Sequence, residues 1–146
     1  MTFLMVLLAV MAVIIGNLLW LRPSQQERAV AAQRRQAEAA GFRVLLRVAP
    51  DWLALPAGER LVAHYHLPLP MPPSQCGRWR WHAGLGNWQP VGLPEAWLAP
   101  PPWPVPAPPG WLGADIRGDG VTVYWREDGQ PASIDAMVTN IRHLAA

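Results

Sequence analysis

The pattern of apolar and polar positions divides the chain into three parts. The first part is an apolar run from Phe3 to Leu21, in which Asn17 is the one strongly polar side chain. As a helix this run would extend over about 28 Å, close to the ~30 Å hydrocarbon core of a bilayer. It lacks the basic residues before it and the small-residue cleavage site directly after it that mark a signal peptide. We therefore expect residues 1–22 to form a retained transmembrane anchor.

The second part, residues 23–41, is polar and has the composition of a helix. Ser24 and Glu27 have the spacing of a capping box, in which each side chain accepts the other residue's backbone N–H. Gly41 is a natural residue for the end of the helix. Because the apolar positions are mostly alanine, the helix lacks a strong stripe to bury in a core. We expect a solvated juxtamembrane spacer of roughly 25 Å, or a helix that lies against headgroups or a neighbouring subunit.

The third part, residues 42–146, has the alternating pattern of a β-rich domain and ends in a helical pattern. The predicted strands are Phe42–Val48, Arg60–Leu67, Arg78–His82, Trp88–Val91 and Val121–Arg126. Apolar residues at spacings of three and four predict a closing helix over Ser133–Leu144. We expect this helix to pack on a small, mainly antiparallel sheet, which makes the domain α+β.

Residues 93–111 interrupt this pattern with eight prolines between Pro94 and Pro109. Such a density of proline excludes a helix or a central strand and favours an extended polyproline conformation. Two interpretations remain open. The segment is either a rigid connector that Trp97, Trp103 and Trp111 hold against the domain, or a displayed ligand for an aromatic groove on a partner.

The arginines predict the orientation of the chain. Four of them follow the apolar run closely: Arg22, Arg28, Arg34 and Arg35. By the positive-inside rule the N-terminus is periplasmic and the C-terminal domain is cytoplasmic. Arg34 is also spaced to pair with Glu38 on one helix face. A single cysteine, Cys76, is consistent with a reducing compartment.

Charge is distributed unevenly along the chain. Residues 22–47 carry six arginines against two glutamates, a net charge of +4, whereas residues 48–146 carry a net charge of −2. The basic excess is therefore juxtamembrane, which favours lipid headgroups as its partner and argues against nucleic acid. All twelve basic residues are arginine. We interpret this bias as the signature of a GC-rich bacterial genome, and hence expect a bacterial inner membrane.

The N-terminal layout resembles a known family. A single span that ends in Leu21-Arg22-Pro23, followed by Gln25-Gln26 and an Arg- and Gln-rich helix, is similar to the small single-span accessory subunit of the bacterial preprotein translocase. The resemblance covers residues 3–41 only, and the soluble domain does not share that family's pattern. It implies an inner-membrane accessory protein of the same layout, associated with protein transport.

Residues able to carry chemistry are few. His64, His66, Cys76 and His82 are of the types that bind zinc, but their spacing matches no strong metal-site pattern. The chain contains no phosphate-binding glycine loop, nucleophile elbow or HExxH motif. We therefore expect no enzyme activity and no cofactor.

Two classes of function follow. The first is a non-catalytic accessory or scaffold subunit of an inner-membrane complex, in which Asn17 contacts a neighbouring membrane helix. The second is a membrane-tethered cytoplasmic binding module for a soluble ligand, a metal or a proline-reading partner.

Overall fold

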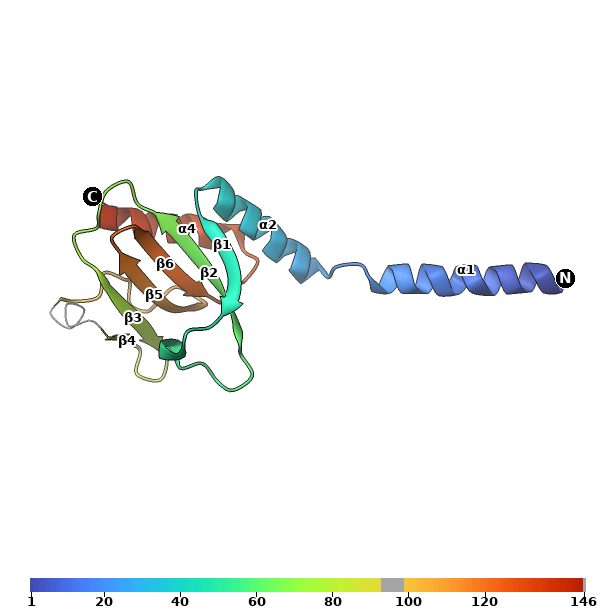
Figure 1. Ribbon diagram of the computed structural model, residues 1–146, viewed down its shortest axis with the longest axis horizontal. Helices are drawn as coiled ribbons and strands as arrows, with labels where there is room; N and C mark the ends of the chain where they lie inside the picture. The colour runs from blue at the N-terminus through green and yellow to red at the C-terminus, as the bar shows by residue number, and fades with distance from the viewer. Residues whose placement is uncertain (93–98, 146) are drawn as a thin grey trace.

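The protein is an α+β domain that carries an apolar helix at its N-terminus (Figure 1). The computed structural model describes residues 1–92 and 99–145, so Trp97 lies outside the described residues. The helices are α1 (Thr2–Trp20), α2 (Gln25–Ala39) and α4 (Pro131–Arg142), with short 3-10 turns η1 (Asp51–Leu53) and η2 (His143–Ala145). The strands are β1 (Arg43–Val48), β2 (Leu61–Pro68), β3 (Gly77–His82), β4 (Asn87–Pro90), β5 (Trp111–Arg117) and β6 (Gly120–Trp125).

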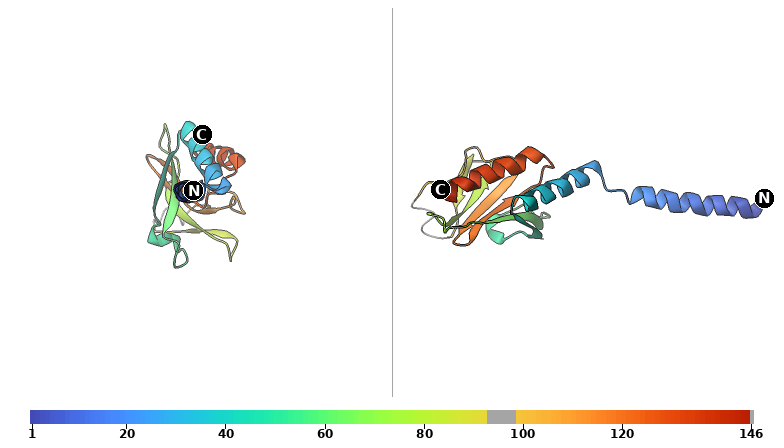
Figure 2. Two further views of the ribbon diagram at one scale, coloured as in Figure 1. Left: turned by 90° about the vertical axis from the view of Figure 1, so that its right-hand side faces the viewer. Right: turned by 90° about the horizontal axis from the view of Figure 1, so that it is seen from above.

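All six strands form one antiparallel sheet in the order β1-β2-β6-β5-β3-β4. The strands and the closing helix that the sequence predicts are confirmed, with boundaries that move by one or two residues. Helices α2 and α4 lie on the same side of the sheet (Figure 2). The fold therefore has two layers, and in the described residues the opposite face of the sheet carries no α-helix, only the short 3-10 turn η1 at one end.

Helix α1 points away from the domain, and every one of its residues is exposed (Figure 1). Its mean hydropathy is 2.6, and it contains no charged side chain. Among the described residues it is the one helix long and apolar enough to cross a membrane, by length and composition.

Helix α2 begins as the sequence predicts. The Ser24 Oγ accepts the N–H of Glu27 at 3.1 Å, and the Glu27 carboxylate accepts the N–H of Ser24 at 2.7 Å. The expectation of a solvated spacer is wrong, because α2 packs against the domain and buries Gln33 and Ala37. The pattern of apolar residues does not predict this contact, because Gln33, the side chain at the centre of the contact, is polar.

Gln33 satisfies its amide group through contacts with the loop before α4. Its Nε2 donates to Asp128 Oδ1 at 2.7 Å and to the Gln130 carbonyl at 2.8 Å, and its Oε1 accepts the N–H of Gly129. These hydrogen bonds offset the cost of removing the amide from water. Burial alone would raise the pKa of Asp128, but hydrogen bonds from Ser133, Gln130 and Gln33 lower it.

Arg34 does not pair with Glu38 as the helical spacing predicts. Its guanidinium instead makes two hydrogen bonds of 2.6 Å to the Glu127 carboxylate, which also accepts the hydroxyl of buried Tyr65 at 2.6 Å. The hydrogen bond from Tyr65 orients the Glu127 carboxylate. Arg34 therefore pairs with this oriented carboxylate and not with the exposed carboxylate of Glu38. The hydrogen bond to Glu127 raises the pKa of Arg34, and burial beside this carboxylate raises the pKa of Tyr65.

Strand β5 is not among the strands predicted from the sequence. This strand pairs with β6 on one side and with β3 on the other, and a register shift lies between Trp111 and Gly113. Residues 114–117 do alternate between apolar and polar side chains, but Gly113, Ala114 and Asp115 are residue types that strands disfavour. Trp111 therefore belongs to β5, and the connector that was expected to end at residue 111 ends before it.

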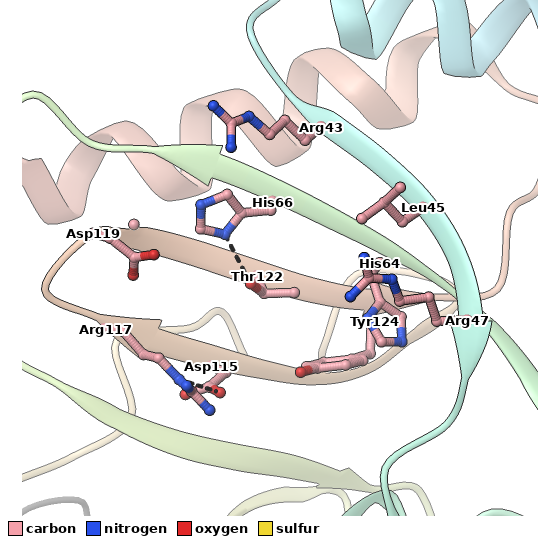
Figure 3. Close-up of a pocket in the computed structure, with 11 residues that line it drawn as sticks. Arg43, Leu45, Arg47, His64, His66, Asp115, Arg117, Asp119, Thr122 and Tyr124 are labelled. Carbon is pink, nitrogen blue, oxygen red and sulfur yellow. Dashed lines mark hydrogen bonds and ion pairs between the residues drawn. The ribbon is translucent and has the colours of Figure 1, made fainter.

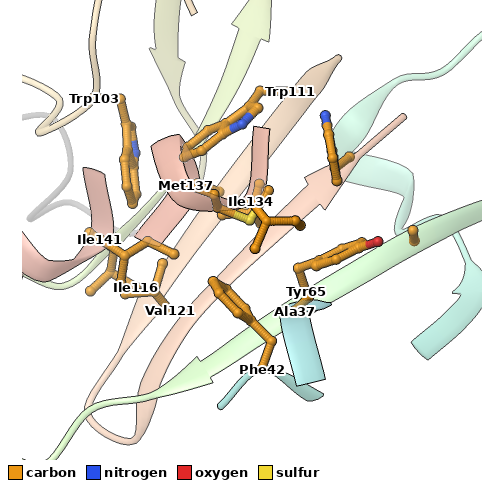
Figure 4. Packing of buried hydrophobic residues seen from close by; sticks show 14 of the residues in the cluster. Ala37, Phe42, Tyr65, Trp103, Trp111, Ile116, Val121, Ile134, Met137 and Ile141 are labelled. Carbon is orange, nitrogen blue, oxygen red and sulfur yellow. The ribbon is translucent and has the colours of Figure 1, made fainter. Parts of the chain in front are cut away.

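The core lies between the sheet and α4 (Figure 4). Ile134, Met137 and Ile141 of α4 are fully buried, as the helical spacing predicts. Tryptophans from β3, β4, β5 and the proline segment pack together in one cluster: Trp79, Trp88, Trp111 and Trp103.

The described part of the proline segment, residues 99–110, is fastened to the domain. The indole N–H of Trp88 donates to the Pro104 carbonyl, and that of Trp125 donates to the Pro109 carbonyl, both at 3.0 Å. Trp103 is 4% exposed, and its ring centroid lies 5.5 Å from that of Trp111. Both candidate partner-binding tryptophans that the structure describes are therefore buried side chains of the core.

Candidate functional site: the open face of the sheet

The face of the sheet opposite the helices carries polar and basic side chains around a shallow hollow of about 380 Å³ (Figure 3). The alternation of each strand explains this, because residues adjacent to core positions point to the other face. The charged and polar residues around the hollow are Arg43, Arg47, His64, His66, Asp115, Arg117, Asp119, Thr122 and Tyr124. They come from β1, β2, β5 and β6, and from the turn before β6.

Arg43 and Arg47 form the basic side of the hollow. Both lie on the exposed strand β1, and within the part of the chain that the structure describes neither has a carboxylate partner. Arg117 differs, because its Nε donates to buried Asp115 Oδ2 at 3.0 Å, and Arg78 contacts the same oxygen at 3.3 Å. Of the three arginines that line the hollow, the two without a carboxylate partner among the described residues are therefore both on β1.

The two histidines project from β2 onto this face, as the period-2 pattern predicts. His66 Nδ1 lies 3.0 Å from Thr122 Oγ1. His64 packs edge-on against Tyr124, and its Nε2 is buried with no hydrogen-bond partner among the described residues. Burial and the positive charge of Arg47 lower the pKa of His64, so this ring is neutral at pH 7.

An aromatic contact between η1 and β6 covers one end of the open face. Trp52 of η1 packs edge-on against Tyr124, with ring centroids 5.0 Å apart, and the Arg78 guanidinium lies 5.0 Å from the Trp52 ring centroid. Gly113 permits this packing, because a Cβ at that position would approach Leu53 Cδ2 to 2.6 Å. Sequence reasoning missed Trp52 and the arginines of this face, since only strand register brings them together.

The four zinc candidates do not assemble into one site. His64 and His66 share the open face, whereas Cys76 is exposed before β3 and His82 ends β3. The His82 Nδ1 accepts the backbone N–H of Leu85 at 3.0 Å, so this ring serves the β3–β4 turn. In residues 1–92 and 99–145 no group of three or more His, Cys, Asp or Glu side chains is placed to hold a metal ion.

The arginines expected at the membrane surface separate into two groups. Arg22, Arg28 and Arg35 are exposed, in the link between α1 and α2 or on α2 itself. Arg34 is held by Glu127, so its charge serves the contact between α2 and the domain. Asn17 is exposed on α1.

Comparison with known proteins adds no assignment: no family model, no curated protein and no solved structure matches the chain.

Proposed function

We propose that the protein is a single-pass inner-membrane protein and acts as a non-catalytic accessory or scaffold subunit of a bacterial membrane complex. The observation that carries this proposal is α1, whose apolar side chains are exposed on every side along its length. Such a helix in water would leave a large apolar surface hydrated, whereas a bilayer accommodates it fully. α1 is the span, the N-terminus is periplasmic and the α+β domain is cytoplasmic.

The joint between span and domain supports a scaffold role. Only residues 21–24 separate α1 from α2, and α2 is fixed to the domain by Gln33 and Arg34. The domain is therefore kept within a short distance of the membrane surface. Arg22 in this link and Arg28 and Arg35 on α2 are exposed and contact anionic headgroups, each with about 1 kcal/mol of attraction.

The likeness of residues 3–41 to the translocase accessory subunit supports an association with protein transport. A polar side chain within a span favours contact with another helix. Asn17 gives the span this means of contacting a membrane-protein partner.

A second candidate function is a membrane-tethered binding module for a soluble ligand. The hollow on the open face favours it, since Arg43 and Arg47 on one side and Asp115 and Asp119 on the other surround a space large enough for a small polar molecule. In that case the domain would need no membrane-protein partner, and α1 would serve only as an anchor.

Purification from native membranes distinguishes the two functions. We expect the tagged full-length protein, extracted in a mild detergent, to retain one membrane protein in a stoichiometric ratio. Replacing Asn17 by leucine keeps the anchor apolar but removes the polar contact, and should reduce recovery of that partner. A chain that purifies alone from several mild detergents would exclude the subunit and favour the binding module.

A further inference from the structure

Strand β1 leaves one edge of the sheet open. It is the terminal strand of the sheet, and within residues 1–92 and 99–145 it pairs only with β2. Its side chains are unusually exposed for apolar residues of a sheet, at 52% for Leu46 and 71% for Val48. Leu61, the cross-strand neighbour of Val48, is 58% exposed. The edge and the apolar patch beside it therefore form one continuous surface.

The hydrogen-bond register identifies the free backbone groups of this edge. The Ala49 N–H donates to the Arg60 carbonyl at 2.8 Å, in the same register that pairs Arg47 with Val62. In an antiparallel ladder, hydrogen-bonded and non-hydrogen-bonded pairs alternate. The N–H and C=O groups of Val44, Leu46 and Val48 therefore point outward, away from β2.

The two edges of the sheet differ in their protection. The opposite edge strand, β4, has four residues and ends at Pro90, and short strands and proline are common means of blocking strand addition. Strand β1 has six residues and contains neither a proline nor a register shift in its pairing with β2. It is thus the edge that can accept another strand.

The charged side chains of β1 indicate which kind of strand this edge would bind. Arg43, Leu45 and Arg47 share the open face, and Val44, Leu46 and Val48 share the helix side. A second copy paired antiparallel about Leu45 would place each Arg43 opposite an Arg47, and like charges directly opposite are destabilising. Pairing about Leu46 would place each Arg47 opposite a Leu45, which leaves the arginines without a neutralising partner. An acidic strand would neutralise both arginines instead. A free anion would also meet Asp115 and Asp119 in the hollow.

We propose that the open edge of β1 binds an extended segment of a partner protein that alternates acidic and apolar residues. Its main chain pairs with Val44, Leu46 and Val48, its acidic side chains lie beside Arg43 and Arg47, and its apolar side chains pack beside Leu46 and Val48. This inference rests on the proposed function, since it describes how a subunit would hold its partner.

Two synthetic peptides test the proposal on the full-length chain in detergent micelles. One is an acetylated octapeptide in which Glu and Val alternate, and the control alternates Lys and Val. We expect only the Glu peptide to bind, with hydrogen-exchange protection of the Val44, Leu46 and Val48 amides. Leu46→Pro removes an outward N–H, which an edge strand tolerates, and should weaken binding about tenfold. Leu46→Thr keeps that N–H and should weaken binding less.

Charge reversal completes the test. Arg43→Glu combined with Arg47→Glu should transfer the preference to the Lys peptide. Equal binding of both peptides, no binding of either, or protection of the three amides in a dimer of the free chain would overturn the proposal. These outcomes concern the edge alone, so they are distinguishable from a failure to recover a membrane partner.

Discussion

Replacing Trp103 by alanine is expected to lower the free energy of unfolding by about 3 to 5 kcal/mol, the range for removal of a large aromatic side chain from a core. Trp103 is 4% exposed and packs against Trp79, Trp88 and Trp111. The cavity left by its indole cannot be closed by the proline segment, whose backbone is fixed at Pro104 by the Trp88 N–H. Urea unfolding of the full-length chain in micelles, followed by circular dichroism, measures the change.

Two variants control this measurement. Trp103→Phe keeps most of the apolar volume, and the Trp103 Nε1 has no hydrogen-bond partner among the described residues, so phenylalanine should cost far less than alanine. Val105 is 66% exposed in the same segment, and Val105→Ala should change stability by less than about 0.5 kcal/mol. A Trp103→Ala variant that stays stable but loses its membrane partner would make the segment a ligand, not a connector.

Glu127→Ala is expected to lower the free energy of unfolding by about 2 to 3 kcal/mol. The Glu127 side chain is 10% exposed, and its loss leaves the buried Tyr65 hydroxyl without its acceptor. The Arg34 side chain is 37% exposed, so water can hydrate its guanidinium and limits the effect. Helix α2 loses its ion pair with the domain and keeps only the contacts of Gln33 and Gln36 among its polar attachments in the described residues, so trypsin should cleave at Arg34 and Arg35 more rapidly.

Glu59 provides the matched control for this substitution. Glu59 and Arg126 also form a bidentate pair, at 2.6 and 2.7 Å, but their side chains are 42% and 53% exposed. Exposed pairs contribute little, so Glu59→Ala should cost no more than about 1 kcal/mol and leave trypsin cleavage of α2 unchanged. Equal effects of the two substitutions would show that Glu127 does not fix α2 to the domain.

Local patterns predicted most elements because their signals are short-range. The capping box needs only Ser24 and Glu27, and the closing helix needs only the spacing of Ile134, Met137 and Ile141. Strand β5 was missed because Gly113, Ala114 and Asp115 have low β-propensity, although residues 114–117 alternate between apolar and polar. Its strand character comes from pairing with β3 and β6, which no local window contains.

The docking of α2 illustrates a different limit. Its contact with the domain runs through Gln33 and Arg34, which reach residues more than ninety positions away. A hydrophobicity scale predicts that both side chains face solvent. Their hydrogen bonds to the domain, however, offset the free-energy cost of burying them. The same limit applies to the open face, where the sequence placed His64 and His66 together but could not add Arg43 or Arg47 without the strand register.

The central claim, a membrane-anchored protein with a cytoplasmic domain, is tested most directly through its single cysteine. Cys76 is exposed on the domain, so it can be labelled in the native chain. A membrane-impermeant thiol reagent should leave Cys76 unlabelled in intact spheroplasts and label it in the membrane fraction after lysis. A Thr2→Cys, Cys76→Ser variant should show labelling in intact spheroplasts. Labelling of Cys76 before lysis, or its recovery in the soluble fraction, would contradict the account.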